Sequence, residues 1–287
     1  MRPLVWRVIA LTAVAAGGSS TACSESSAPP FVKIDDLEGT RGSVEWPAPA
    51  GLAQGGWFAA TDCSELDRIW PPPNEPGQQN WSPATVDPYP TFPGVTSTQA
   101  ARLQTLSPLT GIWGAVMGFS LAVPASDPGA PSTAPDAAVA AACPSADPRN
   151  YPVVPVDVSA YRGITFWAKA GPGARVVRVE LADTNTDPRG DRCNDGSDDT
   201  NCYNYFYVPL LLTDTMTRYT VDFSQLQQEP TWGYRPTPGV PDLQHVYQIQ
   251  FEVDAPRCAM APDVTCADGD TSLSFDLWVD DIYFVNR

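Results

Sequence analysis

Apolar and polar residues alternate one by one along several short segments of the chain, and glycine, proline and asparagine separate these segments. A period of two is typical of a β-strand with one buried face. The pattern predicts an opening strand in 31–39 and further strands at 99–106, 111–123, 161–170, 175–183, 203–212, 217–223, 246–254 and 273–286. No segment keeps a helical period over three turns, and there is no internal repeat.

The phase of each predicted strand separates a core face from a solvent face. The predicted core faces comprise Ile164, Phe166 and Ala168; Val177, Val179 and Leu181; Phe206, Val208, Leu210 and Leu212; Tyr219, Val221 and Phe223; and Tyr247, Ile249, Phe251 and Val253. Many strands without helices predict an all-β fold. We expect one β-sandwich of the jelly-roll kind over residues 31–287, with long Pro-rich loop insertions at 70–95 and 124–149.

The last predicted strand changes phase in its middle. Its apolar residues occupy odd positions up to Val279 and even positions from Ile282 onward, with Asp280 and Asp281 between them. Such a change predicts a β-bulge, which re-aims side chains. A carboxylate turned inward there needs neutralisation, for example by a cation with oxygen ligands. The alternative is a solvated strand edge, where acidic residues discourage pairing with another chain.

The first residues are typical of a targeting segment. Arg2 and Arg7 precede an apolar stretch, Val8 to Ala16, that is too short to span a bilayer comfortably. The following "SSTAC" resembles a bacterial lipobox, although Ser20 stands where leucine is usual. We expect 1–22 to be a lipoprotein signal peptide, Cys23 to be lipidated and 23–30 to be a tether. Ser24 favours outer-membrane sorting within the cell envelope. An ordinary cleavage site with Cys23 as a spare thiol is the alternative.

The composition of the chain further narrows the kind of protein and the partners to expect. With 287 residues, a formal charge of -16, 31 prolines and 21 glycines, the chain is acidic, loop-rich and a poor partner for nucleic acid. Six cysteines remain beside Cys23, and an even set in an exported protein indicates disulfides. Proximity pairs Cys193 with Cys202 and Cys258 with Cys266, which leaves Cys63 with Cys143. Zinc is disfavoured, because there is one histidine and no C-x-x-C pair.

Several motifs occur in an order found in galactose-binding-like jelly rolls. They are "IDDLEG", "GIWGAVMGFSLAV", "VDVSAYRGITFWAKA", "VRVELADTNTDP", "WGYRP" and "FDLWVDDIYFV". The chain resembles carbohydrate-binding modules of family 11 over roughly residues 31–287. The resemblance implies a structural calcium ion between the first and last strands. Its ligands would be Asp36, Glu38 and Asp281, with Asp35 and Asp280 nearby.

A second acidic segment, 183–202, begins like a calcium loop with Asp183, Asn185 and Asp187. Its glycine comes two positions late and no glutamate closes the loop, so the EF-hand interpretation fails. We expect a solvated loop closed by the Cys193–Cys202 disulfide, at the rim of a binding surface.

The solvent faces of the predicted strands have the composition of a sugar-binding surface. Sugars stack on aromatic rings and exchange hydrogen bonds with amides, carboxylates and guanidinium groups. The candidate carbohydrate-binding residues are Trp167, Tyr203, Tyr205, Tyr207, Arg178, Gln248, Gln250 and Glu252, with Asp222 as a further hydrogen-bonding group and Trp232 and Tyr234 at a nearby loop tip. The alternative is that the Pro-rich insertions cover this face and the tyrosines serve ordinary packing.

No catalytic motif is present, and His245 precedes a strand as an edge residue. We therefore expect no enzyme. The first hypothesis is a monomeric, surface-anchored lipoprotein that binds glycan or polysaccharide and holds structural calcium. The second is a structural or protein-interaction lipoprotein of the cell envelope that uses the jelly roll as a scaffold.

Overall fold

The computed structural model describes residues 30–39, 42–61, 69–70, 83–91, 95–106, 114–125, 153–194, 200–254 and 274–287. The predicted signal peptide, the predicted lipidation site Cys23 and the tether as far as Pro29 lie outside these residues. So do those for Cys63, Cys143, Cys258 and Cys266.

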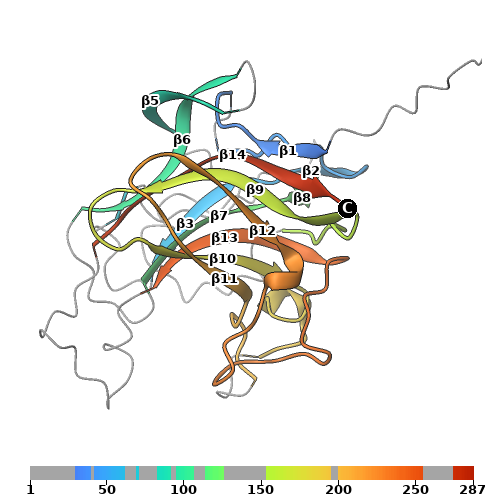
Figure 1. Cartoon of the computed structure of the whole chain (residues 1–287). Helices are drawn as coiled ribbons and strands as arrows, with labels where there is room; N and C mark the ends of the chain where they lie inside the picture. The colour runs from blue at the N-terminus through green and yellow to red at the C-terminus, as the bar shows by residue number, and fades with distance from the viewer. Residues whose placement is uncertain are drawn as a thin grey trace, which may run out of the picture.

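Two antiparallel sheets stack face to face and form the sandwich (Figure 1). One sheet has seven strands, in the order β12-β9-β14-β6-β4, with β1 paired to β14 and β5 paired to β6. Its strands are β1 (Phe31–Asp35), β4 (Ile69–Trp70), β5 (Ala84–Pro90), β6 (Thr96–Thr105), β9 (Tyr161–Ala170), β12 (Thr217–Asp222) and β14 (Asp276–Asn286).

The second sheet has five strands, in the order β11-β10-β13-β7-β3. They are β3 (Trp57–Thr61), β7 (Gly114–Ser120), β10 (Val176–Asp183), β11 (Phe206–Leu211) and β13 (Val246–Asp254). A small pair, β2 (Leu52–Gln54) with β8 (Ala122–Pro124), and two 3₁₀ turns, η3 (Pro188–Gly190) and η4 (Phe223–Gln225), complete the described elements. The prediction of an all-β jelly-roll sandwich is confirmed.

The core lies between the two sheets, where the predicted apolar faces meet. Phe166 of β9 and Phe251 of β13 are fully buried and contact edge to face, with ring centroids 5.1 Å apart. Ile164, Ala168 and Val179 belong to the same buried cluster. The alternation in these strands therefore identified which side chains join the sheets.

One predicted core residue lies apart from the main core. The pairing of β13 with β10 shifts register between Ala182, opposite Gln248, and Asp183, opposite Val246. Val246 joins the core cluster beside this irregularity, whereas Tyr247 is buried, at 6% exposed, but outside that cluster. The guanidinium carbon of Arg189 instead lies 5.0 Å from the centroid of the Tyr247 ring.

Two of the differences between the predicted and observed strands change which surfaces are open. Part of the Pro-rich insertion 70–95 is a strand, β5, whose Pro88 and Pro90 are tolerated because the strand lies at a sheet edge. The predicted strand 203–212 begins only at Phe206, since Tyr203 adopts a φ of 73° that interrupts extended backbone. Tyr203 and Tyr205 therefore belong to a loop.

The outer face of the seven-stranded sheet is covered by β5. Val86 of β5 packs against Ala100 and Trp278, and Tyr89 packs on the same cluster. The Trp278 ring lies between Arg102 and Lys169, whose cationic groups are 4.4 and 4.9 Å from its centroid. Aromatic surface on this sheet is thus used in packing, which leaves the other sheet as the place to look for a binding face.

Candidate functional site

The outer face of the five-stranded sheet carries a row of polar and aromatic side chains. Cross-strand pairing sets Tyr207 beside Glu180, Glu180 beside Gln250, Gln250 beside Gly118 and Gly118 beside Phe58. The neighbouring row pairs Arg178 with Glu252. We call the set formed by Arg178, Glu180, Tyr207, Gln248, Gln250 and Glu252 the polar face.

Its side chains contact one another as well as lying in register. The guanidinium carbon of Arg178 lies 4.4 Å from the centroid of the Tyr207 ring. Arg178 Nη2 and the Tyr207 hydroxyl both approach Glu229 Oε2, at 4.0 and 3.5 Å. Gln250 Nε2 donates to Gln248 Oε1 at 2.9 Å. Glu180, Gln248 and Gln250 are 4%, 6% and 5% exposed, whereas the side chains of Arg178 and Glu229 are each 17% exposed. The part of this connected arrangement that can reach sugar hydroxyls is therefore the guanidinium and carboxylate groups.

Burial divides the predicted aromatic residues. Tyr207 is 7% exposed and Arg178 stacks on its ring, so it offers little open surface for stacking. Tyr203 is 45% exposed and Trp232 is 37% exposed. The open aromatic surface therefore lies beside the polar face, on loops, rather than on strand β11.

Asn204 joins the two loops that carry these exposed rings. Its Nδ2 donates to the carbonyls of Glu229 and Trp232 at 3.1 and 2.6 Å, and its Oδ1 accepts from Glu229 N at 3.0 Å. Tyr203 and Tyr205 flank it and meet edge to face, with centroids 6.1 Å apart. We call Tyr203, Tyr205 and Trp232 the aromatic rim. Asn204 itself was not predicted, because its role depends on a contact 28 residues away.

Arg178, Tyr207, Gln248, Gln250 and Glu252 thus share one face, as predicted. The sequence interpretation did not select Glu180 and Phe58 of the same row, or Glu229. The outward phase of Glu180 in "VRVEL" was a usable signal, whereas Phe58 lies in a strand that the pattern did not predict.

The grouping of Trp167 and Asp222 with these residues is wrong. Trp167 belongs to β9 of the seven-stranded sheet, where its ring lies 5.6 Å from that of Tyr89. Asp222 ends β12 in the same sheet and caps η4 by accepting from Ser224 N. Alternation shows that a side chain leaves the core, but it does not show which of two sheets the strand joins.

The loop after β10 is closed by the predicted Cys193–Cys202 disulfide. Its leading acids are not solvated, which corrects the expectation for this segment, because Asp183 and Asp187 are both 0% exposed. Asp183 accepts hydrogen bonds from Thr186 N and Asp242 N, and Asp187 pairs with Arg189 at 2.5 Å. These carboxylates hold the loop in shape.

The closing strand contains the predicted bulge. The pairing of β14 with β9 shifts register between Asp280 and Tyr283, and Asp281 has a φ of 47°. Asp280 and Asp281 are 0% and 1% exposed, so the alternative of a solvated strand edge is wrong. A non-glycine residue in the left-handed region is uncommon and marks a position held by its surroundings.

Asp280 is held under β5. Its Oδ2 accepts from the hydroxyls of Tyr89 and Ser97, both at 2.5 Å, and its Oδ1 accepts from Asp281 N at 2.7 Å. Burial raises the pKa of Asp280 to about 8, although the hydrogen bonds from Ser97 and Tyr89 act in the opposite direction. Asp280 is therefore a protonated structural residue near neutral pH.

Asp281 is less completely satisfied. Burial raises its pKa to about 6, and the carboxylates of Asp36 and Glu38 act in the same direction. Within the described ranges, Asp281 Oδ2 and Thr91 Oγ1 are buried without a well-formed hydrogen bond, although the nearby Thr91 hydroxyl lowers the pKa of Asp281. A buried carboxylate oxygen without a well-formed hydrogen bond is costly, so this position is suited to a cation with oxygen ligands.

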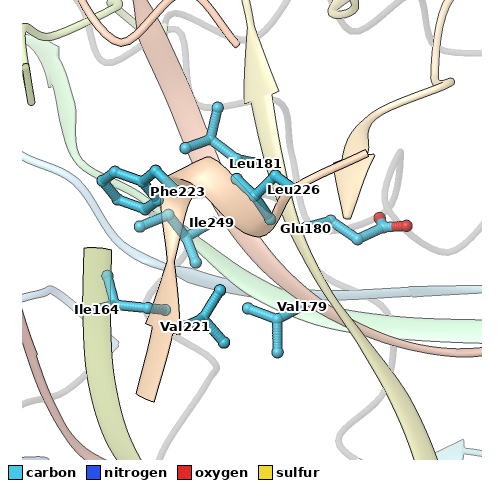
Figure 2. A pocket seen from close by; sticks show the side chains of 8 residues that line it. All are labelled: Ile164, Val179, Glu180, Leu181, Val221, Phe223, Leu226 and Ile249. Carbon is cyan, nitrogen blue, oxygen red and sulfur yellow. The ribbon is translucent and has the colours of Figure 1, made fainter. Parts of the chain in front are cut away.

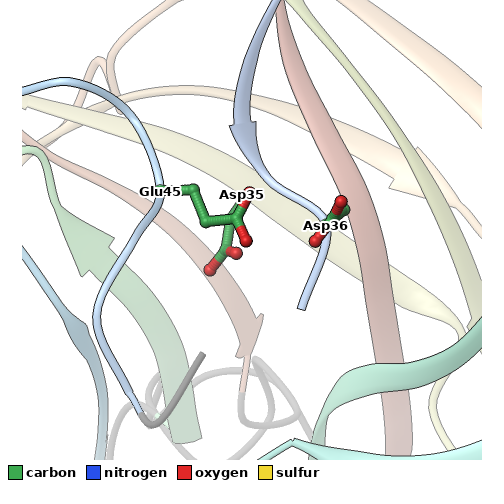
Figure 3. Close-up of side chains that lie close together, drawn as sticks. All are labelled: Asp35, Asp36 and Glu45. Carbon is green, nitrogen blue, oxygen red and sulfur yellow. The ribbon is translucent and has the colours of Figure 1, made fainter. Parts of the chain in front are cut away.

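The other predicted metal ligands are engaged within the protein. Glu38 Oε1 accepts from Thr98 N and Gln99 N at 2.6 and 2.8 Å. Lys33 Nζ lies 2.8 Å from Asp36 Oδ2 and 2.5 Å from Glu45 Oε2. Among the residues that the structure describes, the carboxylates that come within 4.8 Å of one another are Asp35, Asp36 and Glu45 (Figure 3). The predicted set of Asp36, Glu38 and Asp281 is not drawn together to that distance.

An apolar pocket lies inside the sandwich rather than on the polar face (Figure 2). Ile164 and Val221 line it from one sheet and Val179, Leu181 and Ile249 from the other, with Phe223 and Leu226 at its side and the carboxylate of Glu180 directed away. Because its lining is a packing surface of the core, it offers no hydrogen bonds for a sugar.

In the part of the chain that is described, no helix has the length and apolar character needed to cross a membrane.

No family model matches the chain, and no curated relative matches it. The fold is similar to solved structures of family 11 carbohydrate-binding modules, the family that the sequence motifs resemble. One is the module of the cellulosomal cellulase Lic26A-Cel5E of Clostridium thermocellum, with 12% identity, a TM-score of 0.41, and coverage of 91% of this chain and 97% of that one.

A second is the Clostridium thermocellum module in complex with a β-1,3-1,4-mixed-linked tetrasaccharide, with 14% identity, a TM-score of 0.44, and coverage of 91% of this chain and 98% of that one. An exo-β-agarase matches at 13% identity and a TM-score of 0.38, over 89% of this chain and 25% of the agarase.

Proposed function

We propose that the chain is a non-catalytic carbohydrate-binding protein whose glycan lies over the polar face of the five-stranded sheet. The observation that supports this most directly is the contact chain from Arg178 through Tyr207 to Glu229, beside Glu252. It combines a guanidinium group with carboxylates, which exchange hydrogen bonds with sugar hydroxyls, and the exposed rings of Tyr203 and Trp232 lie in loops beside it. The outer face of the other sheet also sets Arg102 and Lys169 over the ring of Trp278, but Trp278 is 8% exposed and packs against Val86 of β5.

The β-1,3-1,4-mixed-linked tetrasaccharide bound by the matched module suggests the first probe, which we choose as a β-1,3-1,4-mixed-linked glucan, within a panel of neutral polysaccharides. We expect the protein to be retarded in native gels that contain a bound polysaccharide. Replacing Arg178 by alanine should weaken retardation about 3- to 10-fold, since one or two hydrogen bonds are lost. Arg102→Ala is the matched control, because Arg102 stacks on Trp278 on the outer face of the other sheet at the same distance, 4.4 Å, as Arg178 on Tyr207. Equal weakening by both variants would contradict the assignment of the face.

A second candidate function rests on an exposed apolar pair at the end of the same sheet. Val176 and Leu211 are cross-strand partners and are 51% and 71% exposed. Such a pair favours the alternative of a protein-interaction scaffold in the envelope. Leu211→Glu should then abolish cross-linking to an envelope protein and leave polysaccharide retardation unchanged. Cross-linking that survives the substitution would exclude this use of the pair.

We infer from the leader that the protein is a lipoprotein anchored at the outer membrane or cell surface through Cys23. Expressed in a bacterium, it should incorporate labelled palmitate and fractionate with membranes. Cys23→Ser should remove both properties. Label that persists in this variant would show that the anchor is elsewhere.

We also propose a structural calcium ion at the bulge of β14. Asp281 would be its central ligand, because Oδ2 of Asp281 is buried without a well-formed hydrogen bond among the described residues and Thr91 Oγ1 is in the same condition. To contribute carboxylate oxygens, Asp36 would have to release Lys33 and Glu38 would have to turn from Thr98 N and Gln99 N. The ion would neutralise a buried acidic cluster and tie the first strand to the last.

A further inference from the structure

We propose that Trp232 is a glycan-stacking residue and that Asn204 is the positioning residue that sets it beside the polar face. This inference deepens the proposed function and rests on it. Trp232 and Tyr203 are the exposed aromatic residues of the described chain, at 37% and 45%. Both lie in loops beside β11, the edge strand of the five-stranded sheet that contains Tyr207.

Hydrogen bonds to the backbone of the loop that contains Trp232 determine the position of this residue. Asn204, itself 3% exposed, donates to the carbonyl of Trp232 at 2.6 Å and to that of Glu229 at 3.1 Å. Tyr234 N donates to the carbonyl of Asn201 at 2.8 Å. The indole is therefore exposed on a backbone that is held from both sides, as pre-organised stacking requires.

The same contacts connect the rim to the polar face. Glu229, whose N–H and carbonyl both bond to Asn204, carries the carboxylate that the Tyr207 hydroxyl and Arg178 approach. A pyranose ring stacked on Trp232 would thus lie next to groups that bind hydroxyls. The expected ligand is a neutral glycan, because Glu180, Glu229 and Glu252 would repel uronic acids.

Gly233 shows how closely the two loops meet. It has a φ of 73°, and an added Cβ would come within 2.5 Å of Asn204 Cβ. Gly239 has a similar φ of 77° but an added Cβ would meet nothing closer than Pro236 O at 3.8 Å. Gly233→Ala and Gly239→Ala therefore share the backbone strain and differ in the contact with Asn204.

The test combines binding with a readout that needs no ligand. In gels containing the mixed-linked glucan, Trp232→Ala should bind about tenfold more weakly. Leu106→Ala, which truncates an apolar side chain 60% exposed at the end of β6, should bind as the wild type does. Equal binding by Trp232→Ala and the wild type would overturn the stacking role alone.

The positioning role is tested by amide hydrogen exchange and by the ¹⁹F resonance of Trp232 in fluorotryptophan-labelled protein, assigned with Trp232→Phe. Asn204→Ala and Gly233→Ala should shift this resonance, raise exchange at Glu229 and Tyr234, and weaken binding. Asn204→Asp keeps the acceptor for Glu229 N but sets an oxygen against the carbonyls of Glu229 and Trp232, so it should be at least as disruptive as Asn204→Ala. Gly239→Ala should change none of these.

An unshifted resonance and unchanged exchange in Asn204→Ala would overturn the positioning role. A wild-type protein that binds no polysaccharide of the panel would overturn the stacking role together with the proposed function. The exchange and ¹⁹F results would still decide whether Asn204 positions the loop, so the two failures are distinguishable.

Discussion

Single residues at the junction of β1, β5 and β14 place carboxyl groups in a buried setting. Asp35 is 0% exposed and accepts from Trp57 Nε1 at 2.7 Å, and burial raises its pKa to about 7. Asp280 lies in a similar environment under β5 and has a pKa of about 8. Both carboxyl groups keep a proton in the folded protein at pH values where the unfolded chain has lost it.

The free energy of unfolding of the metal-free protein should therefore depend on pH through Asp280. Its ordinary pKa is 3.8 and its folded pKa is about 8, so the folded state holds the extra proton between these values. The contribution is complete below pH 4 and is lost as pH rises to 8, at up to about 1.4 kcal/mol per pH unit.

Urea unfolding in EDTA at pH 5 to 9 measures this slope, and Asp280→Asn, which cannot ionise, should flatten it. Identical slopes in the two proteins would show that Asp280 titrates as it does in the unfolded chain.

At the scale of elements, the bulge of β14 combines backbone strain with a buried carboxylate. Asp281→Gly removes the carboxylate but accepts the φ of 47° without cost. Asp281→Ala removes the same carboxylate and keeps the strain. The pair separates what the side chain does from what the backbone requires.

If Asp281 holds calcium, the wild type should gain several degrees in Tm on moving from EDTA to millimolar calcium, and both variants should lose this gain. In EDTA, Asp281→Gly should be more stable than Asp281→Ala by about 1 kcal/mol. Thermal unfolding with and without calcium measures both quantities. A calcium response that survives in Asp281→Gly would exclude Asp281 as a ligand.

The loop after β10 is the second element whose shape depends on a local constraint. Cys193 and Cys202 are 5% and 0% exposed and are nine residues apart. Replacing both by serine should lower the free energy of unfolding by about 2–3 kcal/mol, as loop-closure entropy predicts. Chemical denaturation measures this loss, and the further loss on reduction should be smaller in this variant than in the wild type, which still has the Cys193–Cys202 bond to lose.

At the scale of the whole molecule, one layer of apolar side chains holds the two sheets together. Phe166 and Phe251 meet in that layer from opposite sheets. Phe166→Ala should lower the free energy of unfolding by about 3–5 kcal/mol, because it leaves a cavity between the sheets. Trp232→Ala, on the rim, should change it little. A loss of similar size for both variants, measured by urea unfolding, would show that Trp232 serves the core rather than a ligand.

The local pattern of apolar and polar residues was sufficient to predict the sandwich fold and many of its core residues. Ile164, Phe166, Val179 and Phe251 alternate with polar neighbours, and this alternation survives folding because one face of each strand is buried. The phase change at Asp280 and Asp281 likewise marked the bulge, since an extra residue in a strand leaves a trace in its sequence. Proximity along the chain was enough to pair Cys193 with Cys202.

Contacts between distant segments decided the rest. Trp167 and Tyr207 both alternate outward, yet strand pairing assigns them to different sheets, because alternation carries no information about strand order. Asn204 holds Glu229 and Trp232 through hydrogen bonds across 25 and 28 residues, which no local period records. The sequence alone determined which side chains leave the core, whereas only the tertiary structure decided which of them meet, since loop closure and strand order bring them together.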